Sequence, residues 1–307
     1  MTKTTSTHEK TTIKRRSRYQ RDSQNPPRLY VTVRDQAILA AVGDYRFLSS
    51  DQVQALFFHS ASTAKDRLAK LWQARFLERI YQPVLPTDGS PKALYALARE
   101  GAMLLAQRTG QDVSEFKHLT QKERRSTFFL DHTLCRNDFR IALTMACRRT
   151  RSLKLLAWRQ KPEDLADCVR IPDKPGAEYH RVPLVADGYF EILAEGRKLA
   201  FLVEIDRGTT TCKRISRKLK GYYHWWQQDG PRTRFGVDNL RVLIVTTSDK
   251  RMEHLREVAL DVREDRKGSR LFWLTTQGQV TLYEPWKVLA ETWRTAAASN
   301  GTRHRLV

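Results

Sequence analysis

Cysteine is scarce in this chain, and the short motifs that mark most metal, redox and nucleotide sites are missing. The four cysteines contain no Cys-x-x-Cys pair, which argues against a zinc ribbon or a disulfide framework and indicates free thiols. No two of the eight histidines form a His-x-His pair that could hold a metal beside a tyrosine nucleophile, so Tyr222 and Tyr223 are more simply packing residues. A Walker A loop and a Gly-x-Gly-x-x-Gly motif are also absent, so we expect no nucleotide cofactor.

Long hydrophobic runs are missing as well. No apolar stretch approaches the roughly 18 residues of a membrane span. The first ten residues are polar, where a signal peptide would have an apolar core. We therefore expect a soluble, cytoplasmic protein without a membrane partner.

What the chain has in excess is positive charge. Its 307 residues include 55 Lys and Arg against 34 Asp and Glu, a formal net charge of +21. This excess favours a polyanionic partner, and DNA is the natural one because Lys and Arg neutralise backbone phosphates. A basic protein that binds no nucleic acid is the alternative. The hydrophobic content of 40% is typical of a folded chain.

Composition along the chain predicts five segments. Residues 1–28 are rich in Lys and Arg, have few apolar side chains and contain Pro26-Pro27, which is typical of a flexible basic arm. Four further segments are predicted: a first domain at 29–110, a polar linker at 111–130, a second domain at 131–290 and a mobile C-terminal tail at 291–307.

The first domain has the pattern of three helices, a hairpin and a further helix. Thr32-x-x-Asp35 and Ser49-x-x-Gln52 are helix N-terminal caps, and a third helix follows a short polar break. Two apolar runs at 76–81 and 93–97 flank a turn at 86–91 that contains Pro and Gly. Three helices followed by a two-stranded wing are typical of a winged helix-turn-helix.

In such a domain the third helix would enter the major groove and the wing would lie over the neighbouring backbone. The predicted DNA contacts are polar side chains of this helix and the two ends of the wing, namely Ser62, Thr63, Lys65, Lys70, Arg79 and Lys92. Use of the same domain for protein contacts is the alternative. A homodimer also stays open, although no heptad pattern marks an interface.

Strands and helices alternate in the second domain, which predicts a central mixed sheet. Asp187 lies in a predicted strand at 185–192, on one face with Tyr189 and Glu191, and Glu204 and Asp206 share a face of the strand at 199–206. Glu204 stands in an apolar run, which is a costly position for a carboxylate without a purpose. Carboxylates at this spacing could hold Mg²⁺ or Mn²⁺, which would activate water and stabilise a scissile phosphate.

These motifs resemble known families. An Asp before a hairpin and Glu-x-Lys on the next strand form the metal site of the PD-(D/E)xK, restriction-endonuclease-like nuclease fold. The chain more closely resembles the replication-relaxation family of plasmid and mobile-element proteins. The resemblance implies an α+β protein in which a winged helix precedes a PD-(D/E)xK-like domain. It rests on the order of four elements: the winged helix at 29–97, Asp187-Gly188-Tyr189-Phe190, Glu204-Ile205-Asp206-Arg207-Gly208 and Lys218-Leu219-Lys220-Gly221-Tyr222.

Asp206 stands where the nuclease motif has its lysine. On the helix that follows, Lys218 lies beside the apolar face, so it is the predicted replacement for that cation. The predicted catalytic residues are therefore Asp187, Glu204, Asp206 and Lys218, with Asp187 and Glu204 as the metal ligands. In the structural alternative, Asp206 pairs with Arg207 or Arg214, and Glu204 belongs to a buried ion pair of an inactive fold.

Two functions share this fold and this partner. The first is a DNA-binding protein of plasmid replication or mobilisation, which would work with other proteins of those processes. The second is a divalent-metal-dependent DNA nuclease or nickase. A simple repressor would leave the second domain without a task. The aromatic run at 221–226 is read as a helix packed on the sheet, with stacking on single-stranded bases as the alternative.

Overall fold

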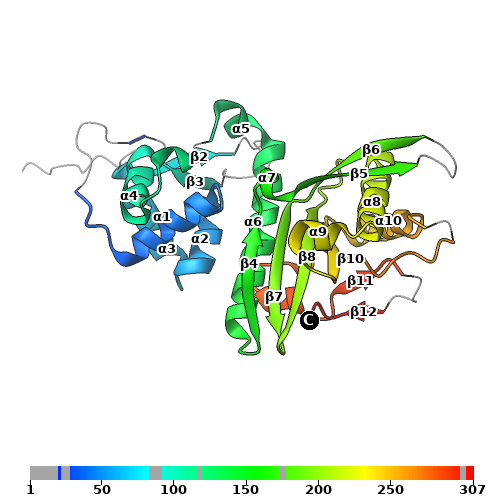
Figure 1. The fold of residues 1–307 in the computed structure, drawn as a ribbon. Helices are drawn as coiled ribbons and strands as arrows, with labels where there is room; N and C mark the ends of the chain where they lie inside the picture. Colours follow the sequence, from blue (N-terminus) through cyan, green and yellow to red (C-terminus); the bar gives the residue numbers. More distant parts are fainter. Residues whose placement is uncertain are drawn as a thin grey trace, which may run out of the picture.

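The computed structural model describes residues 20–21, 28–82, 92–116, 119–172, 178–263, 265–297 and 302–307. Within these ranges the protein is a mixed α+β molecule with two lobes, an N-terminal one before residue 117 and a C-terminal one after residue 118 (Figure 1). The predicted basic arm lies almost wholly outside the described residues, as does the tip of the hairpin at 83–91. No helix of the described ranges combines the length and the apolar composition that crossing a membrane requires.

The N-terminal lobe has the predicted order of three helices, a hairpin and a helix. Ile38, Leu39, Leu68 and Leu71 are fully buried in its core. A three-stranded antiparallel sheet closes this core in the order β1-β3-β2. The elements are α1 Val33–Asp44, β1 Leu48–Ser49, α2 Ser50–Phe57, α3 Ala61–Gln73, β2 Leu77–Tyr81, β3 Ala93–Leu97 and α4 Arg99–Thr109.

Both predicted helix caps are confirmed. The Thr32 side chain accepts a hydrogen bond from the Asp35 amide at the start of α1, and Asp35 accepts one from the Thr32 amide. Ser49 and Gln52 exchange the same pair of bonds at the start of α2. Such capping boxes satisfy backbone donors that the first turn of a helix leaves unpaired, which explains why both helices begin where the motifs predict.

The predicted linker is different in the structure, because it contains helices. The 3-10 helix η2 covers Val113–Glu115 and α5 covers Gln121–Arg125. The latter begins at a third capping box, Thr120 with Glu123, hidden in the sequence by its charged surroundings. The long helix α6, Thr127–Arg149, begins within the predicted linker, where Ser126 caps it.

Helix α6 belongs to the cores of both lobes and runs between them (Figure 1). Its Ile141 is buried in the N-terminal core, whereas Phe139 and Leu143 are buried against the large sheet. The Asn137 side chain also donates hydrogen bonds to the backbone oxygens of Tyr45 and Phe47, at 3.2 and 2.8 Å. The two lobes are therefore joined through a shared apolar and polar interface.

The predicted central mixed sheet is present in the C-terminal lobe, with seven strands in the order β12-β11-β10-β9-β8-β7-β4. β8, β9 and β10 are parallel, and the other pairs are antiparallel. Alternation along β8 packs Ala200 and Leu202 toward α8 and α10, and Phe201 and Val203 toward α6. The elements are β4 Leu153–Arg159, β7 Gly188–Ala194, β8 Arg197–Ile205, α8 Cys212–Gln227, α9 Gly230–Phe235, β9 Leu240–Thr246, α10 Asp249–Leu260 and β10 Phe272–Thr276.

Two parts of this lobe differ from the prediction. A separate hairpin, β5 Ala166–Pro172 with β6 Tyr179–Val185, follows the short helix α7 Pro162–Leu165 and packs on α8. The described part of the predicted tail supplies the edge strands β11 Trp293–Thr295 and β12 Arg303–His304, after the 3-10 helices η3 Gln277–Gln279 and η4 Pro285–Leu289. Trp293 and Leu306 are fully buried. They anchor the segment that was predicted to be a mobile tail.

Candidate functional site

Helix α3 presents the four polar residues that the sequence singles out on it. Ala64 and Leu68 face the core, and this turns the other side of the helix to solvent. Ser62, Thr63, Lys65 and Lys70 are all exposed there. The helix therefore offers two cations and two hydroxyls that a ligand can reach.

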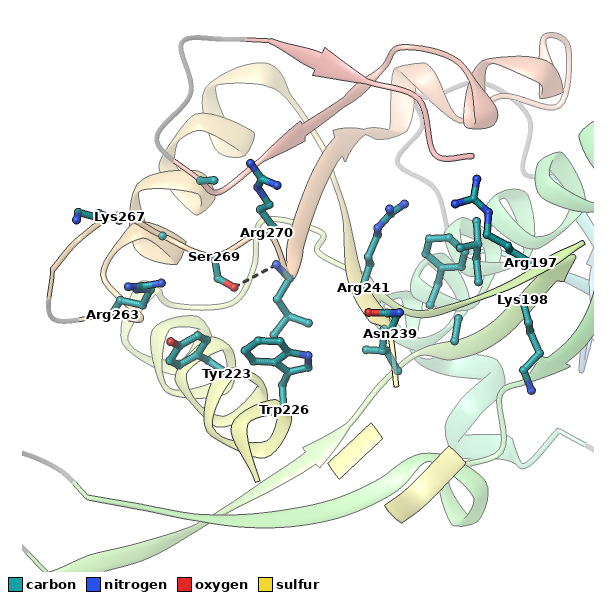
Figure 2. Close-up of a pocket in the computed structure, with 17 residues that line it drawn as sticks. Arg197, Lys198, Tyr223, Trp226, Asn239, Arg241, Arg263, Lys267, Ser269 and Arg270 are labelled. Carbon is teal, nitrogen blue, oxygen red and sulfur yellow. Dashed lines mark hydrogen bonds between the residues drawn. The ribbon is translucent and has the colours of Figure 1, made fainter. Parts of the chain in front are cut away.

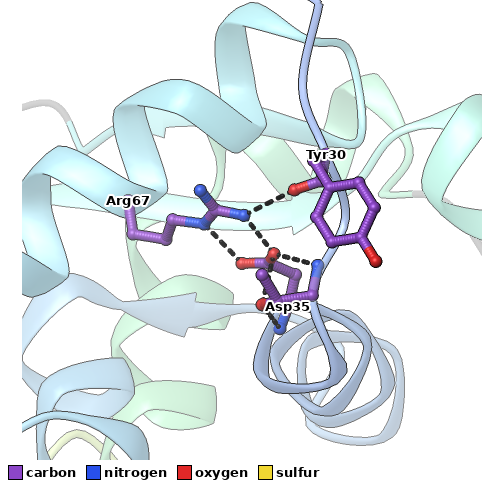
Figure 3. Close-up of polar contacts among 4 residues, drawn as sticks. Tyr30, Asp35 and Arg67 are labelled. Atoms are coloured by element: carbon purple, nitrogen blue, oxygen red, sulfur yellow. Dashed lines mark hydrogen bonds and ion pairs between the residues drawn. The ribbon is translucent and has the colours of Figure 1, made fainter.

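An ion pair holds α3 against the start of α1 (Figure 3). The Arg67 guanidinium donates from Nε to Oδ1 of Asp35 at 2.6 Å, pairs with Oδ2, and donates to the Tyr30 backbone oxygen at 3.0 Å. Asp35 is fully buried. Burial acts to raise the pKa of Asp35, but hydrogen bonds from Arg67 and Thr32 outweigh it and lower this pKa. Arg67 is thus engaged in positioning the helix.

The two predicted contacts on the hairpin differ in their surroundings. Arg79 lies 4.0 Å over the Trp72 ring and 5.4 Å over that of Tyr95, so its guanidinium stacks at the base of the hairpin. Lys92 is exposed and lies 3.9 Å from the Asp51 carboxylate. Arg79, Lys92 and Lys65 line one groove of about 550 Å³ between α3 and the hairpin. Helix and hairpin therefore place three cations in one groove, which Asp51 and Asp66 also line.

In the C-terminal lobe, the structure brings together three of the four predicted catalytic residues. Asp187 precedes β7, and its Oδ2 accepts a hydrogen bond from the Ile205 amide at 2.8 Å. Glu204 lies near the end of β8. Helix α8 places Lys218 against it, with Nζ 2.6 Å from Glu204 Oε2 and 2.9 Å from the Val185 backbone oxygen. Lys218 was predicted beside the apolar face of α8, and the structure places its ammonium against Glu204.

Two further residues complete the cluster around these carboxylates. His132 of α6 has Nε2 3.2 Å from Asp187 Oδ2, and the Tyr222 hydroxyl donates a hydrogen bond to Glu204 Oε1. Neither residue is among the predicted site residues. Tyr222 is marked by the helical spacing of the apolar face of α8, whereas nothing in the sequence links His132 to Asp187, 55 positions away.

The two carboxylates are in different electrostatic states. Burial acts to raise the pKa of Asp187, but His132, Lys218 and the Ile205 amide outweigh it and lower this pKa. Burial raises the pKa of Glu204, and the nearby Asp187 charge adds to this, against the opposing effect of Lys218. The cluster thus contains one well-stabilised carboxylate and one whose charge depends on the Lys218 ammonium.

Asp206 is held by other partners. It accepts hydrogen bonds from Thr246 Oγ1 at 2.6 Å and from Arg251 Nε and Nη2 at 3.0 and 3.1 Å. Its ion pair is therefore with Arg251, and not with the Arg207 or Arg214 of the structural alternative. Arg207 instead pairs with Asp131 of α6 at 2.6 Å.

A family model described as replication-relaxation matches residues 39–237, about two thirds of the chain. The chain belongs to the replication-relaxation family. Membership suggests a role in plasmid replication or relaxation. No curated protein and no solved structure matches the sequence significantly.

The part of the chain that matches the replication-relaxation family contains both candidate sites. It includes the α3 and hairpin groove, and it includes Asp187, Glu204 and Lys218. The match ends before β9, so Arg251, the partner of Asp206, lies outside it. Within the described residues of this replication-relaxation protein, no group of three or more His, Cys, Asp or Glu side chains is placed to hold a metal ion.

Proposed function

We propose that this chain is a DNA-binding protein of plasmid replication or mobilisation, whose N-terminal lobe is a winged helix that reads duplex DNA. The observation that carries the proposal is the groove in which Lys65 of α3 meets Arg79 and Lys92 of the hairpin. These cations come from the two elements that a winged helix applies to DNA. The cytoplasm, where plasmid DNA lies, would be the place of action, with plasmid replication or mobilisation proteins as further partners.

The geometry suggests how the surface would work. Ser62, Thr63, Lys65 and Lys70 are exposed on α3, so they would face base edges and phosphates in the major groove. Arg79, stacked on Trp72, would keep the hairpin at a fixed angle to α3, and Lys92 would reach the neighbouring backbone. Because phosphate contacts release counterions, affinity should fall steeply with salt.

The test is the double variant Lys65→Ala, Lys70→Ala. If each lysine contacts one phosphate, the slope of log K against log salt should become shallower by about 1.8, and duplex affinity at 0.15 M salt should fall roughly 30-fold. The matched control is Lys154→Ala, Lys161→Ala, which removes two exposed lysines from the C-terminal lobe. Equal binding by the test and control variants, measured by fluorescence anisotropy, would refute the assignment of α3.

A second candidate function is metal-dependent DNA cleavage by a PD-(D/E)xK-like C-terminal lobe. The specific observation in its favour is Lys218 Nζ at 2.6 Å from Glu204, from where it could act for the lysine that Asp206 replaces in the motif. Mg²⁺ is commonly bound through one or two carboxylates together with waters and substrate phosphates, so Asp187 and Glu204 fit as its protein ligands. When bound, the ion would lower the pKa of water and stabilise charge on the scissile phosphate.

The side chains would then have separate tasks. Lys218 neutralises Glu204 and is a third exposed, so it can also reach a phosphate oxygen. His132, bonded to Asp187, would hold that carboxylate in its orientation. Tyr222 fixes the other oxygen of Glu204. Asp206, committed to Arg251, would contribute by anchoring the end of β8 rather than by contacting the reacting groups.

A supercoiled-plasmid nicking assay with Mg²⁺ or Mn²⁺ separates the two functions. Metal-dependent nicking that disappears in Glu204→Ala and Lys218→Met, but persists in Lys154→Ala, would support cleavage at this cluster. Nicking that survives Glu204→Ala would refute the site. Duplex binding without any nicking would leave DNA binding as the function.

A further inference from the structure

A second surface lies at the other end of the large sheet, far from the carboxylates. Because β8, β9 and β10 are parallel, their amino ends meet at one edge, whereas Glu204 lies at the carboxyl end of β8. The two ends of β8 are separated by roughly 26 Å. A pocket of about 830 Å³ opens at the amino edge, between the starts of these strands and the last turns of α8 (Figure 2).

The lining of this pocket is strongly cationic. It contains six basic side chains and no Asp or Glu among the described residues: Arg197, Lys198, Arg241, Arg263, Lys267 and Arg270. Carboxylates next to the pocket neutralise part of this charge, as Asp265 does for Arg263 and Glu191 for Lys198 at 3.3 Å. Lys267 and Arg270 are exposed and keep the pocket positive.

One of these cations is set deep. Arg241 lies 4.3 Å over the Trp273 ring, and its Nη1 donates a hydrogen bond to the Leu306 backbone oxygen. Arg241 is half-buried, and this burial lowers the pKa of its guanidinium. An anionic ligand in the pocket would supply the countercharge.

Two aromatic side chains stand among these cations. Tyr222 and Trp225 of α8 are buried on the sheet, as expected for packing, but Tyr223 and Trp226 line the pocket. Trp226 is 41% exposed, and its ring centroid is 6.2 Å from that of Tyr223. Figure 2 shows this pair with Arg263 and Lys267 on one side and Arg241 and Lys198 on the other. The aromatic run therefore serves both packing and an exposed surface.

We propose that this pocket binds single-stranded nucleic acid, with the cations on the phosphates and unpaired bases on Trp226 and Tyr223. Exposed aromatic rings beside a basic groove are the means by which proteins bind single strands without reading their sequence. In a duplex the faces of the bases are covered by their neighbours, so only an unpaired base can stack on Trp226. This site is separate from the duplex contact proposed for α3.

The test uses the full chain and fluorescein-labelled oligothymidine and oligouridine of about 16 nucleotides, with a duplex of equal length. Trp226→Ala should weaken binding of the single strands roughly 5- to 150-fold and leave duplex binding unchanged. Lys267→Ala with Arg270→Ala should make the single-strand salt dependence shallower by about 1.4. Tyr283→Ala, an 87% exposed tyrosine outside the pocket, is the control for loss of an aromatic ring.

Each outcome of these binding measurements either supports or overturns the proposed site. Loss of single-strand binding in Trp226→Ala, with recovery in Trp226→Phe, supports the site, and the stronger of the two oligonucleotides identifies DNA or RNA. Single-strand binding that depends on Lys65 and Lys70 but not on Trp226 would overturn it. Single-strand binding that is weakened by Lys267→Ala with Arg270→Ala but not by Trp226→Ala would also overturn it. Failure of duplex binding in the α3 variant leaves this inference untouched, because the two probes are different. Unfolding curves for Trp226→Ala check that the exposed residue is dispensable for folding.

Discussion

Asp138, on the face of α6 that meets α2, offers the most quantitative test of how the lobes are joined. Its Oδ1 accepts a hydrogen bond of 2.7 Å from Nε2 of Gln52, the capping residue of α2. Burial raises the pKa of Asp138 to about 6, although Gln52 opposes this effect. Asp138→Asn keeps an oxygen for Gln52 and removes the charge, so we expect the variant to be more stable than the parent at neutral pH.

The magnitude follows from proton linkage. The unfolded chain would have a carboxyl pKa of about 3.9, and each tenfold difference in proton affinity is about 1.4 kcal/mol. The charged form therefore costs at most about 3 kcal/mol in the folded state above pH 6. Between about pH 4 and 6 the native state binds more protons than the unfolded one, so the free energy of unfolding falls as pH rises through this window and is flat above it. Asp138→Asn should remove that slope.

Urea unfolding at several pH values measures both effects. The variant should gain about 1–3 kcal/mol at pH 7.5 and change little at pH 4. Asp66→Asn, which alters an exposed carboxylate of α3, is the matched control. The reasoning would be refuted by a variant that is less stable than the parent at pH 7.5. It would also be refuted by a variant whose free energy of unfolding keeps the parent's slope between pH 4 and 6. Either result would show that the charge of Asp138 does not destabilise the folded protein.

Two further predictions concern the N-terminal lobe. Asp35→Asn should lower the free energy of unfolding by about 2 kcal/mol, since it leaves Arg67 without its buried partner. This deficit should shrink as pH falls below about 4, because the lowered pKa of Asp35 no longer favours the native state there. Gly101→Ala should cost about 1–3 kcal/mol or more, because the added Cβ would lie 2.2 Å from the Phe76 backbone oxygen. Gly278→Ala, whose added Cβ has room, is its control in thermal unfolding. Full stability of Gly101→Ala would contradict the close packing of α4 against the backbone of Phe76, just before β2.

The elements that the sequence predicted well are those with local signals. Capping boxes at Thr32 and Ser49 fixed the starts of α1 and α2, because such caps act within one helical turn. Helical spacing also placed Lys218 on the side of α8 that meets β8. The second-domain strands were predicted through their apolar runs, and their mixed pairing agrees with the alternation of strands and helices.

What the sequence could not provide are partners distant along the chain. His132 meets Asp187 across 55 positions, and Arg251 meets Asp206 across 45, so only the folded sheet brings them together. The C-terminal edge strands were missed because three residues of β11 and two of β12 carry too little pattern, and Trp293 is buried by tertiary packing alone. Which residues of the aromatic run at 221–226 are exposed likewise depends on what α8 packs against, and this is a tertiary contact.

The sharing of α6 has a consequence for how DNA would be handled. His132 and Asp131, at one part of this helix, contact Asp187 and Arg207, while Ile141 and Asn137 lock into the N-terminal lobe. These contacts lie between Asp131 and Ile141, about 15 Å apart along α6. If α3 binds a duplex as proposed, the shared helix would hold the carboxylates of the C-terminal lobe at one fixed position relative to that duplex.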